Sequence, residues 1–320
     1  MNGTVPDVVR VLILFNPISG SGRSARLASE LAVTLERLAE EDGCPLEIEQ
    51  AETRPEPAEH WLDARLDSIE LLVVVGGDGA MRLAAPAAMR CRVPVYHYPG
   101  GTENLFARDF GMQATPEALF SAIREGETRS IDVAWADGEL VLICASIGLD
   151  AEVSRDLAEH RSGSISHLSY LPPLLRQVRR WRARPPAFEV EVDGGLLGPS
   201  TSGLVIVANS RQYALRLDPV HMADHLDGAI DVVQLPARTL LGLLVWIIRC
   251  RLRRQFRSRQ ARHARGLSVV VRSDRPSTVQ IDGDPAFDGA PRELLRVVVE
   301  PAALQVLPPP VRESGSRSAG

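Results

Sequence analysis

Two patterns of hydrophobic positions divide the chain. Before residue 131, short apolar runs alternate with segments in which apolar residues recur at helical spacing. The run VLILF at 11–15, for example, precedes a leucine-rich amphipathic segment at 24–41. Continuous apolar runs such as LLVVV at 71–75 are typical of parallel strands that are covered on both faces. The pattern therefore predicts a doubly wound α/β domain over residues 7–130.

After residue 131, the apolar runs are short and are separated by turn residues. AFEVEVDGG at 187–195 and SGLVIVANS at 202–210 are examples. These short strands predict a β-sandwich domain over 131–308, and its last segment is a candidate to return to the first domain. One helix-like insertion at 166–181 interrupts the strands, and a disordered tail is predicted over 309–320.

All 36 basic residues are arginine, because the chain contains no lysine. This excludes a lysine Schiff base, a lysine nucleophile and a P-loop lysine. The net charge of −5 gives no case for a nucleic-acid partner. The four cysteines lie far apart, without the spacing of a metal site, and this favours a reduced, cytoplasmic protein.

No signal peptide is predicted at the start of the chain, which lacks a long apolar region after a basic start. The longest apolar run, at 240–248, is too short to span a bilayer. Both features agree with a cytoplasmic location. The sequence leaves the oligomeric state open, a homodimer included.

Three glycine-containing loops follow three of the predicted strands. They are NPISGSG at 16–22, GGDGAM at 76–81 and PGGTEN at 99–104. In an open α/β sheet, ligands bind outside the carboxyl ends of the strands. Glycine lets backbone N–H groups approach an anion, and helix N-termini add positive charge at the same place. One such loop is usually only a turn, but three at one edge, with Asp78 among them, predict a phosphate-binding site.

The first loop also fits a different nucleotide-binding pattern. Residues 20–25 match G-x-G-x-x-A between a strand and a helix, which is the dinucleotide fingerprint of oxidoreductases. However, Asn16 and Pro17 lengthen the turn, and a chain without lysine has no Tyr-x-x-x-Lys pair. An oxidoreductase is therefore the alternative from another reaction class.

The motifs NPISGSGR, VVVGGDGAM and PGGTENLFAR, in this order, resemble the catalytic domain of the diacylglycerol kinase and sphingosine kinase family. Bacterial lipid kinases belong to that family, and NAD kinases share its GGDG fold. The resemblance continues through ASIGLDAEV and VQIDGDP, and it covers the chain from Val11 to about Pro301. It implies ATP- and Mg²⁺-dependent phosphorylation of a lipid hydroxyl, most readily that of diacylglycerol, in a cleft between the two domains.

The resemblance also implies roles for particular residues. Asp78 would support Mg²⁺ directly or through water, and Asp282 would be the base that accepts the proton of the lipid hydroxyl. Asp132 matches a family aspartate at the cleft, with a turn carboxylate as the alternative, and Asp227 matches one near a structural Mg²⁺ site. The residues expected around the nucleotide are Asn16, Gly20, Gly22, Arg23, Gly76, Gly77, Asp78, Gly79, Gly101, Thr102, Asn104 and Asp284.

Elementary chemistry agrees with these roles. Phosphoryl transfer needs positioned phosphates, neutralised charge and one proton acceptor. Carboxylates are suitable Mg²⁺ ligands, and an aspartate from a second domain can act as the base opposite the phosphates. Arg23 is a candidate phosphate clamp, with a solvated helix-start arginine as the alternative. Thr102 is also expected to cap a short helix that ends at Gly111.

The chain departs from the motifs of the family at four places, one of which is YALRL at 213–217 in place of a glycine run. Ala80 replaces the threonine of GGDGT, Leu105 replaces the aspartate of GTGND, and Asp284 replaces the glutamate of DGE. These changes bear on the metal arrangement and on the acceptor. The alternatives to a diacylglycerol kinase are an NAD kinase or other small-molecule kinase of the same fold, and a nucleotide- or lipid-binding protein with a decayed site.

One segment, 240–265, joins an apolar half to a half with eight arginines from Arg249 to Arg265. No Asp or Glu occurs between Asp231 and Asp274, so this is a basic island in an acidic protein. We expect the segment to bind an anionic membrane surface and to make the protein peripheral on the inner face of the membrane. A core helix with a solvated basic end is the alternative.

Two further features have weaker functional interpretations. His221 and His225 stand four residues apart, a spacing that can bind a transition metal on a helix, but the Asp-Gly turn that follows favours a surface loop. Tyr170, in LSYLPPLL, could line a lipid entrance, although an apolar stretch usually belongs to the core.

Overall fold

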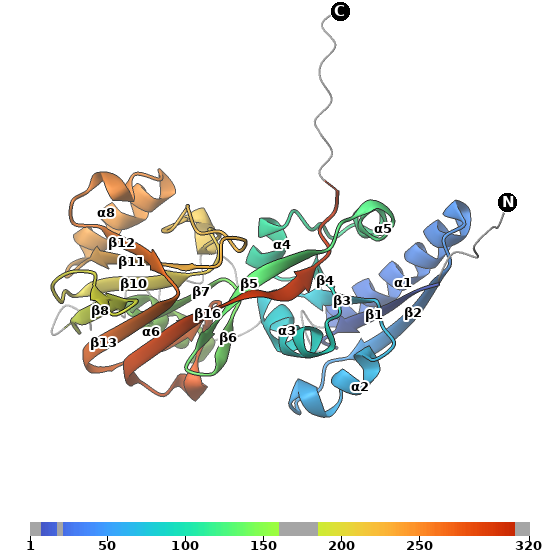
Figure 1. Ribbon diagram of the computed structural model, residues 1–320, viewed down its shortest axis with the longest axis horizontal. Helices are drawn as coiled ribbons and strands as arrows, with labels where there is room; N and C mark the ends of the chain where they lie inside the picture. Colours follow the sequence, from blue (N-terminus) through green and yellow to red (C-terminus); the bar gives the residue numbers. More distant parts are fainter. Residues whose placement is uncertain (1–7, 18–21, 160–184, 311–320) are drawn as a thin grey trace, which may run out of the picture.

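The computed structural model describes residues 8–17, 22–159 and 185–310. Figure 1 shows two lobes side by side, with the N-terminal lobe coloured blue to teal and much of the C-terminal lobe yellow to red. Several predicted features lie outside the described residues, namely Gly20, Tyr170, the helix-like insertion at 166–181 and the tail beyond residue 310.

The first lobe is built on parallel strands in the order β2-β1-β3-β4. These are β1 (Val9–Phe15), β2 (Leu46–Glu52), β3 (Leu71–Gly76) and β4 (Val95–Pro99). The helices are α1 (Arg23–Asp42), α2 (Asp63–Leu66), α3 (Asp78–Cys91), α4 (Leu105–Asp109) and α5 (Pro116–Glu125). Helix α1 contacts α5, and α2 contacts α3. The two pairs lie on opposite sides of the strands in Figure 1, so the predicted doubly wound α/β domain is confirmed.

Two long antiparallel strands, β5 (Arg129–Ala136) and β16 (Arg292–Val306), connect the lobes. The register of their pairing shifts between Glu300 and Leu304, and β16 then pairs in parallel with β4 through Val306 and Val95. The last strand of the chain therefore returns to the sheet of the first lobe. The predicted boundary between residues 130 and 131 falls inside β5. The two lobes are therefore joined by paired strands and not by a flexible linker.

The second lobe contains two antiparallel sheets. In one, β16 is followed by β13, β8 and β9, and the other has the order β12-β11-β10-β7-β14-β15. The strands of the second lobe are β6 (Glu139–Val141), β7 (Cys144–Gly148), β8 (Phe188–Val192), β9 (Gly195–Leu196), β10 (Gly203–Ala208), β11 (Ile230–Pro236), β12 (Arg262–Gly266), β13 (Ser268–Ser277), β14 (Val279–Ile281) and β15 (Asp284–Pro285). Val205 and Val207 of β10 share a buried cluster with Val269 and Val271 of β13, which confirms the predicted β-sandwich.

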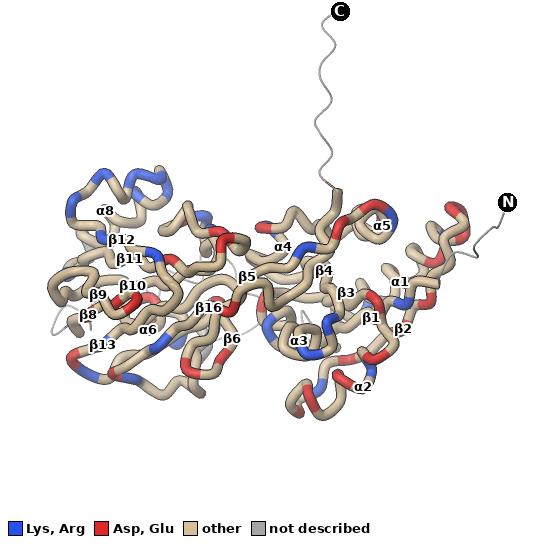
Figure 2. The backbone as a smooth tube through the Cα atoms, viewed as in Figure 1, with Lys and Arg blue, Asp and Glu red and all other residues tan. Residues whose placement is uncertain are grey.

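Two helices pack on the second lobe, α6 (Leu149–Glu159) and α8 (Leu240–Arg251). Because side chains alternate along a strand, Leu204 and Ile206 of β10 face away from the sandwich interior. They line a cavity together with Trp246 of α8. In Figure 2, basic residues gather at α8 and at the turn that follows it, whereas acidic and basic residues are mixed over the first lobe.

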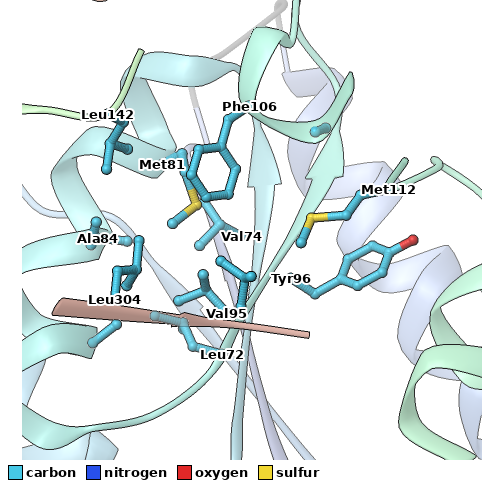
Figure 3. Close-up of a cluster of buried hydrophobic side chains, with 14 of the residues drawn as sticks. Leu72, Val74, Met81, Ala84, Val95, Tyr96, Phe106, Met112, Leu142 and Leu304 are labelled. Atoms are coloured by element: carbon cyan, nitrogen blue, oxygen red, sulfur yellow. The ribbon is translucent and has the colours of Figure 1, made fainter. Parts of the chain in front are cut away.

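A buried cluster beneath the β3–α3 turn packs residues from different parts of the chain against one another. Figure 3 shows Met81 of α3, Phe106 of α4 and Val74 of β3 packed together, with Leu142, which follows β6, and Leu304, near the end of β16, joining the same group. All five side chains are buried almost completely. Apolar packing therefore fixes the loops above this cluster from both sides.

Candidate active site

The three glycine loops leave the sheet at one edge, as their positions after parallel strands predict. Strands β1 and β4 flank β3 in parallel register, and Gly76 is level with Pro99. Asn16, which is half-buried, follows β1 at this edge. On the other side of the same loop, Gly22 precedes α1 with φ of 85°, and Arg23 begins the helix as an exposed residue.

The second and third loops contact each other through their backbones. The N–H of Gly100 donates to the carbonyl of Gly76 at 2.7 Å. A methyl group added to Gly101 would lie 2.7 Å from the Cα of Gly77, closer than real side chains approach. Gly101 is thus required by this loop-to-loop contact, whatever it also does for a phosphate. The contact makes the two loops one unit.

Asp78 connects that unit to the next helix. Its carboxylate accepts hydrogen bonds from the backbone N–H groups of Leu105 and Phe106, both at 3.0 Å. These are the first amides of α4, which otherwise lack partners within the helix. The carboxylate that was predicted to support a metal therefore also caps a helix, and it stabilises the positive end of that helix dipole.

The predicted cap at Thr102 is wrong. The residue is exposed, and α4 begins only at Leu105, after Asn104. Asn104 has a left-handed backbone, with φ of 49°, and its side-chain amide closes the turn by accepting from the N–H of Gly101 at 2.8 Å and donating to its carbonyl at 2.9 Å. The helix start is thus set by Asp78 from another loop, while the predicted stop at Gly111 agrees with its φ of +67°.

His97 lies under the same loops and is fully buried. Burial lowers the pKa of His97, although the nearby carboxylate of Asp78 opposes this effect. The ring is therefore neutral near pH 7, and its Nε2–H donates to the carbonyl of Gly76 at 2.9 Å. This bond fixes the last peptide of β3.

Asp282 reaches the same region from the second lobe. Its carboxylate accepts three backbone N–H groups, from Leu142 and Cys144 at 3.0 Å and from Ile143 at 2.8 Å. Burial raises the pKa of Asp282 to about 6, although these three bonds and the charge of Arg82 lower it. A carboxylate with this pKa is largely ionised at pH 7 and can still accept a proton, as a general base must.

Residues of both lobes meet around Asp282. A methyl group on Gly79, at the start of α3, would lie 3.3 Å from Oδ2 of Asp284. On the same helix, the guanidinium of Arg82 lies 3.6 Å from the carboxylate of Glu139 and 3.8 Å from that of Asp284. The DGD turn of the second lobe therefore faces the beginning of α3, which follows the GGDG turn of the first.

Arg82 was missed by the reasoning from sequence. It stands four residues after Asp78 on α3, so the two side chains share one face of the helix. In a chain without lysine, an arginine at this spacing after a predicted phosphate loop is the signal that could have identified it.

The predicted metal ligands Asp132 and Asp227 are engaged elsewhere. Both oxygens of the buried Asp132 accept main-chain hydrogen bonds, from Gly228 at 2.6 Å and from Ala302 at 2.8 Å. Asp227 forms an ion pair with Arg265. Among the described residues, no group of three or more His, Cys, Asp or Glu side chains could hold a metal ion. Asp132 thus acts as a clamp between β5, a loop and β16, in line with the turn-carboxylate alternative.

The surface-loop interpretation of His225 is also wrong. The side chain is buried, with its Nε2 at 2.8 Å from the carboxylate of Asp109 at the end of α4. Its Nδ1 lies 3.0 Å from the side-chain amide of Asn209, and Ser210 donates to Asp109 at 2.6 Å. This polar network ties α4 to the second lobe and so fixes the position of the third glycine loop.

A cavity of about 170 Å³ opens beside Asp282. It runs between the outer face of the β7–β10–β11 sheet and the helices α6 and α8. Most of its lining is apolar and includes Leu105, Leu149, Val153, Leu204, Ile206, Leu217, Leu235, Leu243, Trp246 and Ile247. Leu105, which replaces a carboxylate of the family motif, therefore contributes to an apolar wall.

A small polar group lies within this lining. The carboxylate of Asp150 accepts from Ser146 at 2.6 Å and from Gln280 at 3.2 Å. Burial raises the pKa of Tyr213 well above its usual range, and a hydrogen bond with Asp150 adds to this shift. Local sequence patterns gave no signal for this group, because its members come from three separate segments. The cavity is thus apolar along most of its length and polar near Asp282 and Gln280.

Comparison with known families agrees with this architecture. Residues 10–136 match the model of the diacylglycerol kinase catalytic domain, and residues 144–308 match that of the YegS C-terminal NAD kinase beta sandwich-like domain. Among curated relatives, the diacylglycerol kinase of Mycobacterium tuberculosis strain H37Rv is 28% identical over 244 residues, which cover 73% of this chain and 76% of the relative. An uncharacterized protein of Synechocystis is 22% identical over 289 residues, which cover 85% of this chain but only 65% of that protein.

Solved structures show the same fold. A diacylglycerol kinase from Bacillus anthracis superposes with a TM-score of 0.68 at 19% identity, covering 95% of this chain and 98% of that one. Yeast NADH kinase complexed with NADH gives a TM-score of 0.50 at 12% identity, covering 93% and 82% of the two chains. The matched families and the named relatives indicate a kinase. The β-sandwich match covers more than half of the chain, so the chain belongs to the family with a YegS C-terminal NAD kinase beta sandwich-like domain, preceded here by a match to the diacylglycerol kinase catalytic domain.

Proposed function

We propose that this protein is an ATP- and Mg²⁺-dependent lipid kinase that transfers the γ-phosphate to a hydroxyl of diacylglycerol or a similar lipid. The observation that carries the proposal is the apolar cavity that ends at Asp282. An acyl chain would fill the apolar part, and its glycerol hydroxyl would then lie at the carboxylate.

Asp282 would act as the general base. As the hydroxyl oxygen of the lipid bonds to the γ-phosphorus and the bond to the leaving ADP oxygen breaks, the hydroxyl proton would move to Asp282. Only one N–H, that of Leu142, donates to its Oδ2, so this oxygen keeps acceptor capacity. The raised pKa of Asp282, about 6, favours the transfer near neutral pH.

The nucleotide would lie against the glycine loops, where backbone N–H groups and the start of α3 favour its phosphates. Mg²⁺ usually needs only one or two carboxylates in addition to phosphates and water. The carboxylate of Asp284 fits this requirement, because its side chain is 51% exposed and its contact with Arg82 is a loose 3.8 Å. Asp78 fits less directly, since two amides already occupy its oxygens.

The alternatives explain fewer features. An NAD kinase would have to hold a polar dinucleotide, whereas the cavity next to Asp282 is mainly apolar. Two retained carboxylates argue against a decayed site: Asp284 faces the start of α3, and Asp282 lines the cavity. The departure at Leu105 supports a lipid site, because this residue lines the cavity.

The test is incubation with labelled ATP, Mg²⁺ and a panel of diacylglycerols, other lipid alcohols and NAD, followed by separation of the products. The proposal expects label in a phosphorylated lipid, with diacylglycerol among the best acceptors. Label in the NAD product, or no product with any acceptor, would refute it.

A variant that fills the cavity tests the lipid site itself. Ser154 lines the cavity from α6 and is not fully buried, so Ser154→Phe can fill space without repacking the core. We expect turnover of long-chain diacylglycerol to fall by about tenfold or more, with short-chain substrates affected less. Ser154→Ala is the matched control, and an equal loss on both substrate lengths would contradict the assignment.

A further inference from the structure

Helix α8 carries apolar side chains on both of its sides. The inner side lines the cavity with Leu243, Trp246 and Ile247. The outer side faces solvent, and its large hydrophobic residues are Leu241, Leu244, Val245, Ile248 and Leu252. Leu241 is 71% exposed and Ile248 is 58% exposed. These outer residues follow helical spacing, so they form one continuous stripe.

A stripe of this kind indicates a binding surface. Single exposed apolar residues are normal on a protein, but a contiguous group usually marks an interaction site. A helix that is apolar on all sides is normally buried in a core or a membrane. The 12 residues of α8 extend over only about 18 Å, well short of the roughly 30 Å of a bilayer core. Among the described helices, none has the length and apolar character that spanning would require.

The positive charges at the end of α8 and just after it indicate that the partner of this surface is negatively charged. Arg251, Arg254, Arg257 and Arg259 are all exposed. In the described part of the chain, none of the four has a carboxylate within ion-pair distance. Arg253, in contrast, is paired with Asp218 at 2.9 Å. Figure 2 shows basic positions gathered at α8 and at the turn that follows it.

We propose that the outer face of α8 and the four arginines dock the protein on an anionic membrane surface. The helix would lie in the plane of the interface, with its leucine and isoleucine side chains at the acyl boundary and the arginines at lipid phosphates. If the proposed lipid kinase function holds, this docking has a consequence. The helix that touches the membrane is the wall of the cavity, so a lipid leaving the bilayer enters beside α8.

A second copy of the chain fits this surface less well. A two-fold interface would bring each arginine cluster close to its own copy, and like charges would repel. An anionic bilayer can contact both the apolar stripe and the positive charges. The convex surface of a helix can also dock on a bilayer without a groove in the partner.

The experiment is co-sedimentation of the full chain with vesicles of phosphatidylcholine, alone or mixed with phosphatidylglycerol, at low and high salt. The charge variant replaces Arg251, Arg254, Arg257 and Arg259 with Gln. Its control removes the same charge from the first lobe, by replacing Arg10, Arg26, Arg37 and Arg92 with Gln. The apolar variant combines Leu241→Ser with Ile248→Ser, and its control combines Val33→Ser with Leu196→Ser, both exposed residues elsewhere.

We expect the parent and both controls to bind the mixed vesicles, bind neutral vesicles far less, and be released as salt rises. The charge variant should bind the mixed vesicles at least about tenfold more weakly, because each arginine near such a surface contributes roughly fivefold before screening. The apolar variant should also bind more weakly. Equal binding by either variant and its control, or no preference for anionic vesicles, would overturn the proposal.

Two further measurements distinguish membrane docking from dimerisation and from failure of the proposed kinase function. If gel filtration shows a dimer that the apolar variant loses, the stripe is an interface between copies and the proposal fails. Activity on detergent-dispersed diacylglycerol should be unchanged in both variants, because the substituted residues do not line the cavity. Vesicle binding without any lipid phosphorylation in detergent would refute the proposed function and leave the membrane surface intact.

Discussion

The guanidinium of Arg82 lies 3.8 Å from the carboxylate of Asp284, and this contact crosses from one lobe to the other. Arg82 is only 22% exposed, and its charge also acts on the catalytic candidate Asp282. In the proposed kinase reaction, Arg82 would be a cation beside the transferred phosphate between the two lobes. This relationship leads to the first prediction.

Replacing Arg82 with Gln should lower kcat by about 10- to 100-fold, since one positive group near the transferred phosphate is lost. Arg82→Lys should recover part of the loss, because charge is kept while the planar guanidinium is not. Arg90→Gln, on the solvent-exposed end of the same helix, is the control. Steady-state kinetics at saturating ATP checks the prediction, and an unaffected kcat in Arg82→Gln would contradict it.

Activity should depend on pH through Asp282. The ionised carboxylate is the active form and its pKa is about 6, so kcat/KM should be constant above pH 7 and fall about tenfold per unit well below pH 6. The same shift has the opposite effect on stability. Because the folded pKa lies above the usual 3.8, the folded state holds this proton more tightly, and the contribution of Asp282 to stability falls as pH rises from about 4 to 6.

These two pH effects can be measured separately. Initial rates across the pH range report the first, and chemical denaturation of the parent and of Asp282→Asn reports the second. A rate profile without any transition between pH 5 and 7 would exclude Asp282 as a base with this pKa.

Asp78→Asn should weaken the link between the GGDG turn and α4. An asparagine side chain has only one oxygen, so one of the amides of Leu105 and Phe106 loses its acceptor, at a cost of about 1–3 kcal/mol. Hydrogen exchange at these two amides should accelerate, and turnover should fall by on the order of 10²-fold. Unchanged exchange at both amides in a folded variant would contradict the capping role.

Because the two glycine loops touch, ATP affinity should be far more sensitive to a substitution at Gly101 than at a glycine with open space around it. In Gly101→Ala, the new methyl group would lie 2.7 Å from the Cα of Gly77 and 2.9 Å from the side-chain oxygen of Asn104, so the two loops must separate. We expect ATP affinity to fall by about tenfold or more, measured by calorimetry. Gly195→Ala, where the nearest atom is 3.4 Å away, is the control and should bind ATP normally.

Local patterns explain why much of the fold was predictable. The unbroken apolar run of β3 reflects burial on both faces of the sheet, and the short apolar run of β10 between turn residues was likewise predicted correctly as a strand of the second domain. The convergence of the glycine loops followed from a general rule for parallel sheets. Each of these inferences needed only residues that are close together in sequence.

Local sequence was insufficient where distant residues decide. The start of α4 depends on Asp78, 27 residues away, and not on the nearby Thr102. Asp132 is held by main-chain groups 96 and 170 residues away, and His225 is buried by its partner Asp109. No periodicity or motif contains such pairings, because tertiary packing creates them.

In the proposed reaction, Asp282 is the base that serves a lipid held in the apolar cavity. The most direct measurement compares the parent with Asp282→Asn, determining kcat on diacylglycerol and, independently, the Kd for ATP, after thermal unfolding has shown that the variant is folded. We expect kcat to fall by on the order of 10²- to 10⁴-fold while the Kd for ATP changes by less than about threefold. An unchanged kcat, or a parallel loss of ATP binding and kcat, would contradict it.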